Sequence, residues 1–239
     1  MTATKDDKRL ELIAQLLAKA ESTTPEEAEA LTEHAERLML KYGIDQALID
    51  ERRSRTGHTG EEIIEKSIVF DGVYARELVR LGGAVAHALG NLRPLKARNR
   101  HGSEVLYLVG YESDVAQGEL LVRSLHVQAL VAMRSWWDEH RTLYTRGTEH
   151  DRRRARFGFL RGFSVGVAER ITDNRHKVVS EAGTGTELVL VSRKQRVDEH
   201  VDGRGYRKAR APRSTDSLGA AGGYRAGLEA NTGERAVTH

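Results

Sequence analysis

Apolar side chains recur at helical spacing near the start of the chain and predict two amphipathic helices. In residues 6–21 one face carries an apolar stripe, made of Leu10, Ile13, Leu16, Leu17 and Ala20. After Pro25 a second stripe follows, made of Ala28, Leu31, Ala35, Leu38 and Met39. Because only a few residues separate the two helices, we expect them to run antiparallel. Two helices cannot bury both stripes alone, so the hairpin must dock on the rest of the chain or on a partner.

Local signals mark where the second helix begins and ends. Thr24 can cap its first turn, Pro25 stands at its first helical position, and Glu27 completes a capping box. Gly43, which precedes an isoleucine, is typical of a left-handed stop with its hydrophobic contact. These signals predict a helical hairpin over residues 1–50.

The hairpin resembles a family of bacterial and phage proteins known as domain of unknown function 2786. The resemblance covers residues 12–44 and is carried by "LLAKAEST", "PEEAEAL" and "AERLMLKYGI". The later segments "VLYLVGYESDVAQGELLVRSL" and "FLRGFSVGVAERI" are similar to the region that often follows this hairpin in phage members. The resemblance implies no activity, cofactor or catalytic residue.

A change of period after residue 60 predicts a strand followed by a helix. Residues 51–60, "ERRSRTGHTG", are polar with two glycines and are typical of a linker. Alternation of apolar and other side chains in residues 64–70 predicts a strand. Residues 73–89 return to helical spacing, and Gly90 is the predicted stop.

The next segment predicts two strands and a long helix. Pro94 restricts "NLRPLKAR" to the edge of a sheet if it is a strand, and "SEVLYLVGY" is rich in β-forming residues. Asp114, with Gln117 three residues later, can cap a helix that reaches about His140. Because this helix is apolar on nearly all sides, we expect it to be the central element of the core.

These elements predict an α+β fold that is mostly helical. We expect the helical hairpin at 1–50, an α+β domain with long helices at 61–191, and a basic, partly disordered C-terminal region at 192–239. The elements follow the order strand, helix, strand, strand, helix. A helix-strand-strand-helix order of this size also occurs in double-stranded RNA-binding and other nucleic-acid modules, which is a weak analogy because fold does not determine function.

Arginines gather at the start of the helix predicted in the last third. The cluster consists of Arg152, Arg153, Arg154, Arg156 and Arg161. Positive charge at a helix N-terminus opposes the helix dipole at a cost of about 0.3–1 kcal/mol per charge. An anionic ligand would relieve this cost, and the guanidinium fork suits phosphate. The alternative is that the arginines form a solvated face paired with the acidic N-terminal hairpin.

The segment "DGRGYRKARAPRSTD" is basic and lacks apolar periodicity, so it is typical of a disordered arm that tracks a nucleic-acid backbone. We count among the candidate phosphate contacts Arg204, Arg207, Lys208 and Arg210.

Glycines recur four residues apart in two places. One set consists of Gly158, Gly162 and Gly166, and the other of Gly219, Gly223 and Gly227. Three glycines inside a helix cost roughly 3 kcal/mol relative to alanine. Either the two glycine faces, or copies of one, approach each other closely, or the C-terminal run is flexible.

The net charge of +3 hides a strong asymmetry. Residues 1–50 carry a net −5, residues 51–150 a net +1, and residues 151–239 a net +7. A basic last third indicates a polyanion partner or self-association between the two ends of the chain; the alternative is that the arginines are simply spread over solvated faces. The chain has no cysteine, so disulfides, thiolate nucleophiles and cysteine-bound zinc are excluded. It shows no signal peptide and no membrane-spanning run, so we expect a cytoplasmic protein.

No motif predicts catalysis or a cofactor. A metal site built from His140, His150 and His200 has little support, because no ligand spacing links them. We therefore predict a non-enzymatic, nucleic-acid-associated protein of phage or actinobacterial type, with no cofactor and no membrane partner. The alternatives are a protein-interaction or oligomeric scaffold, in which the hairpin and the glycine faces form subunit contacts, and, third, a metal-dependent hydrolase.

Overall fold

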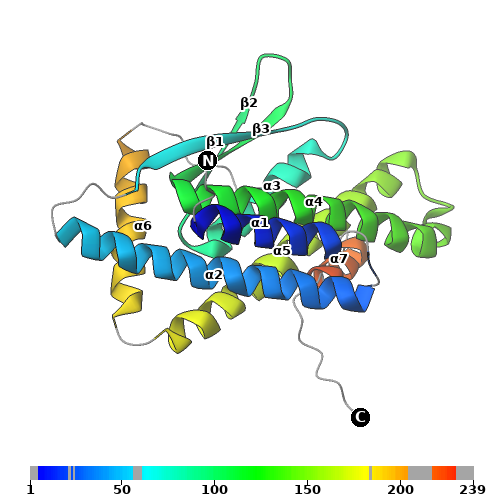
Figure 1. Cartoon of the computed structure of the whole chain (residues 1–239). Helices are drawn as coiled ribbons and strands as arrows, with labels where there is room; N and C mark the ends of the chain where they lie inside the picture. Colours follow the sequence, from blue (N-terminus) through cyan, green and yellow to red (C-terminus); the bar gives the residue numbers. More distant parts are fainter. Residues whose placement is uncertain are drawn as a thin grey trace, which may run out of the picture.

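The computed structural model describes residues 5–20, 23, 25–55, 61–182, 185–203 and 217–229. Its helices are α1 (Lys5–Ala20), α2 (Pro25–Arg55), α3 (Ala75–Leu89), α4 (Glu112–His140), α5 (Glu149–Glu181), α6 (Thr186–Asp202) and α7 (Ser217–Glu229), with a short 3-10 turn at Arg141–Tyr144. Its strands are β1 (Ile63–Phe70), β2 (Arg93–Arg98) and β3 (Glu104–Tyr111). The mostly helical α+β fold is confirmed (Figure 1).

The three strands form one antiparallel sheet in the order β1-β3-β2. The register pairs Ile63 with Tyr111 and Arg93 with Val109. Pro94 lies in β2, at the edge of the sheet, as its missing N–H requires. Helices α3 and α4 both contact the sheet, and α5 packs against these two helices.

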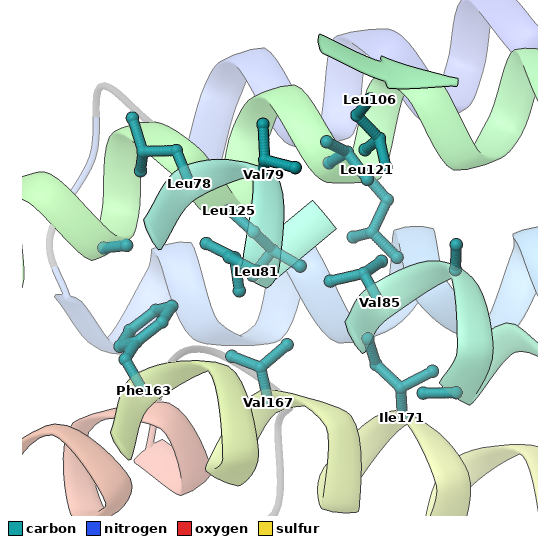
Figure 2. Packing of buried hydrophobic residues seen from close by; sticks show 14 of the residues in the cluster. Leu78, Val79, Leu81, Val85, Leu106, Leu121, Leu125, Phe163, Val167 and Ile171 are labelled. Atoms are coloured by element: carbon teal, nitrogen blue, oxygen red, sulfur yellow. The ribbon is translucent and has the colours of Figure 1, made fainter. Parts of the chain in front are cut away.

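The core centres on α3, which lies between the sheet and α4 on one side and α5 on the other (Figure 2). Leu81 and Val85 of α3 are fully buried between Leu121 of α4 and Val167 of α5. The predicted stop of this helix is confirmed, because Gly90 adopts a left-handed φ of 80°.

The N-terminal helices form the predicted antiparallel pair (Figure 1), but α2 does not end at Gly43. It continues to Arg55 because its apolar stripe continues, with Ile44 and Ala47 both buried. Gly43 instead lies inside the helix and is buried, and a Cβ there would make an ordinary van der Waals contact with Asp114 Oδ1 at 3.4 Å. The predicted linker is therefore helical as far as Arg55, and residues 56–60 and Thr24 lie outside the described residues.

Helix α4 ends at His140 as predicted, but it begins before Asp114. Its N-cap is Tyr111, which makes no capping bond with its side chain. Asp114 lies inside the first turn, 2% exposed, and binds two residues from other elements. The predicted capping role of Asp114 is thus wrong, because its carboxylate is used in a buried network described below.

The two glycine faces pack against each other. A Cβ at Gly223 of α7 would lie 1.8 Å from the carbonyl oxygen of Phe159, and one at Gly162 of α5 would lie 2.0 Å from that of Ala220. Tyr224 Oη also donates a hydrogen bond to Glu169 Oε2 at 2.7 Å. The close approach of α5 and α7 is confirmed, and residues 217–229 are helical.

Helix α6 was not predicted. It runs across residue 192, where the sequence suggested a domain boundary, and it packs against α2, β2 and β3. Among the described residues no helix is both long enough and apolar enough to cross a membrane.

Candidate nucleic-acid interface

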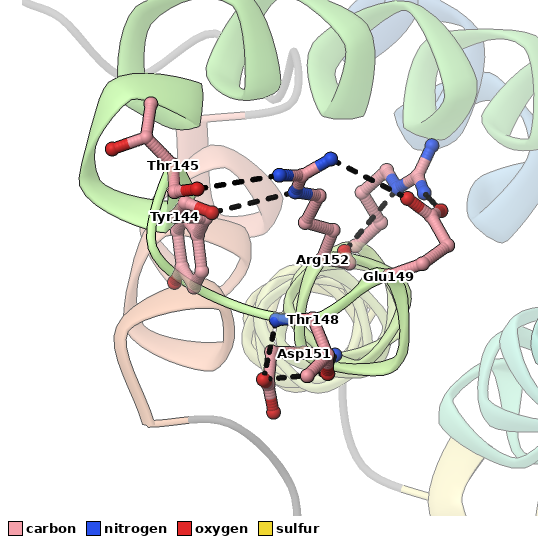
Figure 3. Close-up of polar contacts among 7 residues, drawn as sticks. Tyr144, Thr145, Thr148, Glu149, Asp151 and Arg152 are labelled. Atoms are coloured by element: carbon pink, nitrogen blue, oxygen red, sulfur yellow. Dashed lines mark hydrogen bonds and ion pairs between the residues drawn. The ribbon is translucent and has the colours of Figure 1, made fainter.

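The first turn of α5 carries its own negative charge. Thr148 caps the helix in a capping box with Asp151, whose carboxylate accepts hydrogen bonds from the backbone N–H and the hydroxyl of Thr148 (Figure 3). These bonds lower the pKa of Asp151. Glu149 stands in the same turn, so two carboxylates compensate the positive end of the dipole. The premise that the arginines need an external anion at this point is therefore wrong.

Two members of the predicted cluster face back towards this turn. Arg152 donates to the carbonyl oxygens of Tyr144 and Thr145 at 3.3 and 3.4 Å (Figure 3). Arg156 pairs with Glu149 at 3.0 Å, and its guanidinium lies 5.0 Å from the ring centre of Trp137. Both side chains are held by groups of the protein itself.

Arg161 is bound to a carboxylate that sequence reasoning missed. Its Nε and Nη2 donate to the two oxygens of Glu77 at 3.1 and 2.9 Å. Glu77 lies on α3 and is 3% exposed. The alternative that the arginines pair with the acidic hairpin is wrong for Arg152, Arg156 and Arg161, whose carboxylates come from α3 and α5.

Arg153 and Arg154 are the exposed members of the cluster. The guanidinium of Arg153 lies 5.1 Å from the ring centre of Phe157. Phe157 in turn makes an edge contact with Tyr74, with ring centres 5.7 Å apart. These contacts hold Arg153 along one side of a cleft.

The cleft has a volume of about 330 Å³ and lies between the start of α3, the β2–β3 hairpin and α5. Arg153 and Arg161 line it together with two arginines that the sequence did not single out, Arg76 and Arg98. Arg154 does not line it. The sequence feature that could have pointed to Arg98 was the basic run "RPLKARNRH" of the β2–β3 hairpin, which lies outside the arginine cluster.

Cations outnumber carboxylates around this cleft. Glu104 lies 3.7 Å from Arg76 and accepts from Arg98 at 3.1 Å, so one carboxylate serves two arginines. Glu77, which binds Arg161, also lies 3.5 Å from Arg80. Asp71 is the remaining acidic side chain in the lining.

Two more titratable side chains, Lys96 of β2 and His87 of α3, also have cations as neighbours. Burial lowers the pKa of Lys96, and the charge of Arg80 lowers it further, while Glu77 opposes the shift. Burial also lowers the pKa of His87, with Lys96 and Arg93 adding to the effect. Burial is the larger cause of both pKa shifts, and the neighbouring cations add to it.

The remaining candidates are not placed at the cleft. Arg204, Arg207, Lys208 and Arg210 lie outside the described residues. In the part of the chain that the structure describes, no group of three or more His, Asp or Glu side chains could hold a metal ion. The structure thus gives no support to a metal site at His140, His150 and His200.

A second polar cluster is buried between α4 and α6, beside helix α2 of the N-terminal hairpin. Arg193 of α6 donates to Asp114 at 3.0 Å and to Glu61 at 2.7 Å, and lies 3.6 Å from the ring centre of Tyr111. Asn91 donates to the other oxygen of Asp114 at 2.7 Å. The adjoining cavity holds only about 30 Å³, too little for a nucleotide. We interpret this cluster as the link that fixes α6 to the body.

Asp114 makes the stability of the fold depend on pH. Burial raises its pKa from 3.8 to about 6, although Arg193 and Asn91 lower it, and Glu61 raises it further. The folded protein therefore holds this proton more tightly than the unfolded chain does. The contribution to stability grows as pH falls from about 6 towards 3.8, and is lost as pH rises through 6.

The comparison of the protein with an Asp114→Asn variant isolates this contribution. As pH falls from about 7 to about 4.5, we expect the unsubstituted protein to gain stability relative to the variant, because only the unsubstituted protein takes up a proton at Asp114. Urea unfolding at several pH values measures this difference. Subtracting one free energy of unfolding from the other cancels the pH dependence of the carboxylates that the two proteins share. A difference that is constant with pH would show that Asp114 does not titrate in this range.

Comparison with known proteins finds a match for the N-terminal part of the chain. Residues 9–46 match the family described as protein of unknown function (DUF2786). No curated protein and no solved structure matches the chain. The resemblance of the hairpin is thus confirmed, and that of the later segments to phage members stays a prediction. The matched segment contributes Gly43 and Ile44 to the cavity beside Asp114.

Proposed function

We propose that this chain binds the phosphate backbone of nucleic acid through the cleft between α3, the β2–β3 hairpin and α5. The observation that carries the proposal is the unequal sharing of charge: Glu104 serves two arginines, and Glu77 serves Arg161 and Arg80. Arg153 lies at the same cleft, against an aromatic ring instead of a carboxylate.

The exposure of these arginines suits them to phosphate. The side chains of Arg76 and Arg98 are 70% and 55% exposed, so their ion pairs with Glu104 are screened by water and contribute only about 0–1 kcal/mol. A phosphate group can take over such guanidinium groups at little cost. The side chain of Arg161 is 23% exposed and donates to both carboxylate oxygens of Glu77, so it supports the wall of the cleft.

The scaffold alternative has less support. One premise was that the hairpin stripes need a partner, yet α1 contacts α4, and α2 contacts α4, α5 and α6. The other was that the glycine faces join subunits, yet those of α5 and α7 pack against each other within this chain. Ile13, Leu17, Ala35 and Met39 of the hairpin are buried within this chain. Self-association through the hairpin would have to use its remaining surface.

A double substitution of exposed arginines tests the proposal. We expect Arg98→Ala/Arg153→Ala to weaken binding to all sequences alike and to reduce the slope of log K against log salt by about 2, one unit for each lost phosphate contact. Fluorescence anisotropy with labelled DNA and RNA at several salt concentrations measures both quantities.

The matched control is Arg134→Ala/Arg225→Ala, which removes two exposed arginines that do not line the cleft and carries the same change in net charge. We expect this control to keep the salt slope of the unsubstituted protein. Equal losses in the two double variants would mean that net charge alone, and not the cleft, attracts the nucleic acid.

A further inference from the structure

We infer that the cleft selects single-stranded nucleic acid, with an unpaired base against its apolar side and the adjoining phosphates on Arg98 and Arg153. This inference rests on the proposed function and adds to it the kind of strand that is bound. It is carried by the apolar side chains of Val73 and Phe157 in the lining, which backbone binding alone does not use.

Apolar and aromatic side chains lie beside the arginines of the cleft. Val73 lines it and is 62% exposed, so its side chain is open to contact by a ligand. Phe157 lines it as well and is only partly buried. A base can pack on such a surface, and the guanidinium of Arg153 over Phe157 offers a second flat face for stacking.

Two turns hold the rims of the cleft in fixed shapes. In the turn before α3, Gly72 has φ +85°, a conformation that favours glycine, and Val73 follows it with its side chain exposed. In the β2–β3 turn, Asn99 Oδ1 accepts from the backbone N–H of His101 at 3.0 Å and of Ser103 at 2.9 Å. Ordered rims reduce the entropy lost on binding.

The size of the cleft favours one strand. A volume of about 330 Å³ is at the lower end of the roughly 300–1,000 Å³ found for small-ligand pockets, which fits one nucleotide unit. In a duplex the bases are stacked and paired, so they cannot reach Val73 or Phe157, and only phosphates remain to be bound. An unpaired strand offers both parts to the cleft.

Four labelled oligonucleotides of equal length separate the contributions of base and backbone. They are single-stranded DNA, single-stranded RNA, the DNA duplex, and an abasic single strand that keeps the sugar–phosphate backbone. We expect the unpaired strands with bases to bind roughly 5- to 150-fold more tightly than the abasic strand, the range that stacking of one base provides. They should also exceed the duplex.

Val73→Ser tests the apolar contact in a position where the exposed side chain contributes little to folding. We expect it to weaken binding of the unpaired strands several-fold and to leave the abasic strand unchanged. The control is Val131→Ser, at a valine of α4 that is 61% exposed and does not line the cleft.

The possible failures are distinguishable. If the duplex and the abasic strand bind as tightly as the unpaired strands, and Val73→Ser changes nothing, the single-strand inference is overturned and phosphate binding stands. If none of the four oligonucleotides binds at low salt, the proposed function itself is wrong.

Discussion

Replacing Arg193 with methionine is expected to lower the free energy of unfolding by about 3–5 kcal/mol, since breaking a buried ion pair leaves a buried charge without compensation. Arg193 is 5% exposed and binds both Asp114 and Glu61. Methionine keeps most of the volume but removes the charge, so the 2%-exposed carboxylate of Asp114 retains only Asn91. Part of this loss of stability is recovered at lower pH, at which Asp114 is protonated and carries no charge.

Urea unfolding at neutral pH measures the loss, and Lys194→Met is the matched control. Lys194 is the next residue of α6, and its side chain is 53% exposed and paired with Asp198. Loss of such a surface pair costs about 0–1 kcal/mol. The double variant Asp114→Asn/Arg193→Met should be more stable than Arg193→Met alone, because no unpaired carboxylate remains. If Arg193→Met and Lys194→Met cost the same, the cluster is not what holds α6.

Sequence reasoning predicted the elements whose apolar pattern is complete. The alternation in β1 and the helical period of α3 each continue to a clear end, and Gly90 has the left-handed conformation that its position indicated. Pro94 placed β2 at the edge of the sheet for a reason of covalent chemistry. In these segments local pattern and tertiary packing agree.

The pattern was misleading where a polar side chain occupies a buried position. Helix α6 presents Arg193, Val197 and Val201 on one buried face at a spacing of four, but the arginine interrupts the apolar stripe. Asp114 has the sequence features of an N-cap, yet its partners Arg193 and Asn91 lie far away in the sequence. Such pairs are defined by the tertiary fold, so a local pattern cannot show them.

The candidate site was found only in part. The arginine cluster pointed to α5, but Arg152 binds the carbonyl oxygens of Tyr144 and Thr145, and Arg156 binds Glu149. Of the five clustered arginines, Arg153 and Arg161 line the cleft. Arg76 and Arg98, which complete it, stand in segments whose local patterns showed only a helix and an edge strand.

The glycine pattern gave a correct expectation from a physical argument. Interior glycines cost about 1 kcal/mol each relative to alanine, so a helix that carries three of them must gain stability elsewhere. The structure supplies this gain in the contact between α5 and α7, where Gly166 and Gly227 also leave room only for backbone. The carbonyl oxygen of Gly227 accepts from Arg170 at 3.3 Å in the same interface.

Substitution of Gly223 by alanine sets two effects of opposite sign against each other. Helix propensity alone predicts that α7 gains about 1 kcal/mol. The added methyl group would lie 1.8 Å from the carbonyl oxygen of Phe159, which belongs to the backbone of α5 and cannot rotate away. Overpacking of this kind costs typically 1–3 kcal/mol and occasionally more. Because the 1.8 Å contact is with backbone, we take the upper part of this range and expect a net loss of stability of about 2 kcal/mol, with α7 displaced from α5.

Hydrogen exchange of residues 217–229, together with urea unfolding, measures this result, and Ala221→Leu is the control because Ala221 is an exposed position of the same helix. Faster exchange in α7 of the Gly223→Ala variant, with little change in the control, is the expected outcome. A Gly223→Ala variant that is more stable than the unsubstituted protein would mean that propensity dominates and that α7 does not pack against α5 through its glycines. The sign of one free-energy difference thus decides whether the glycine faces join the two helices.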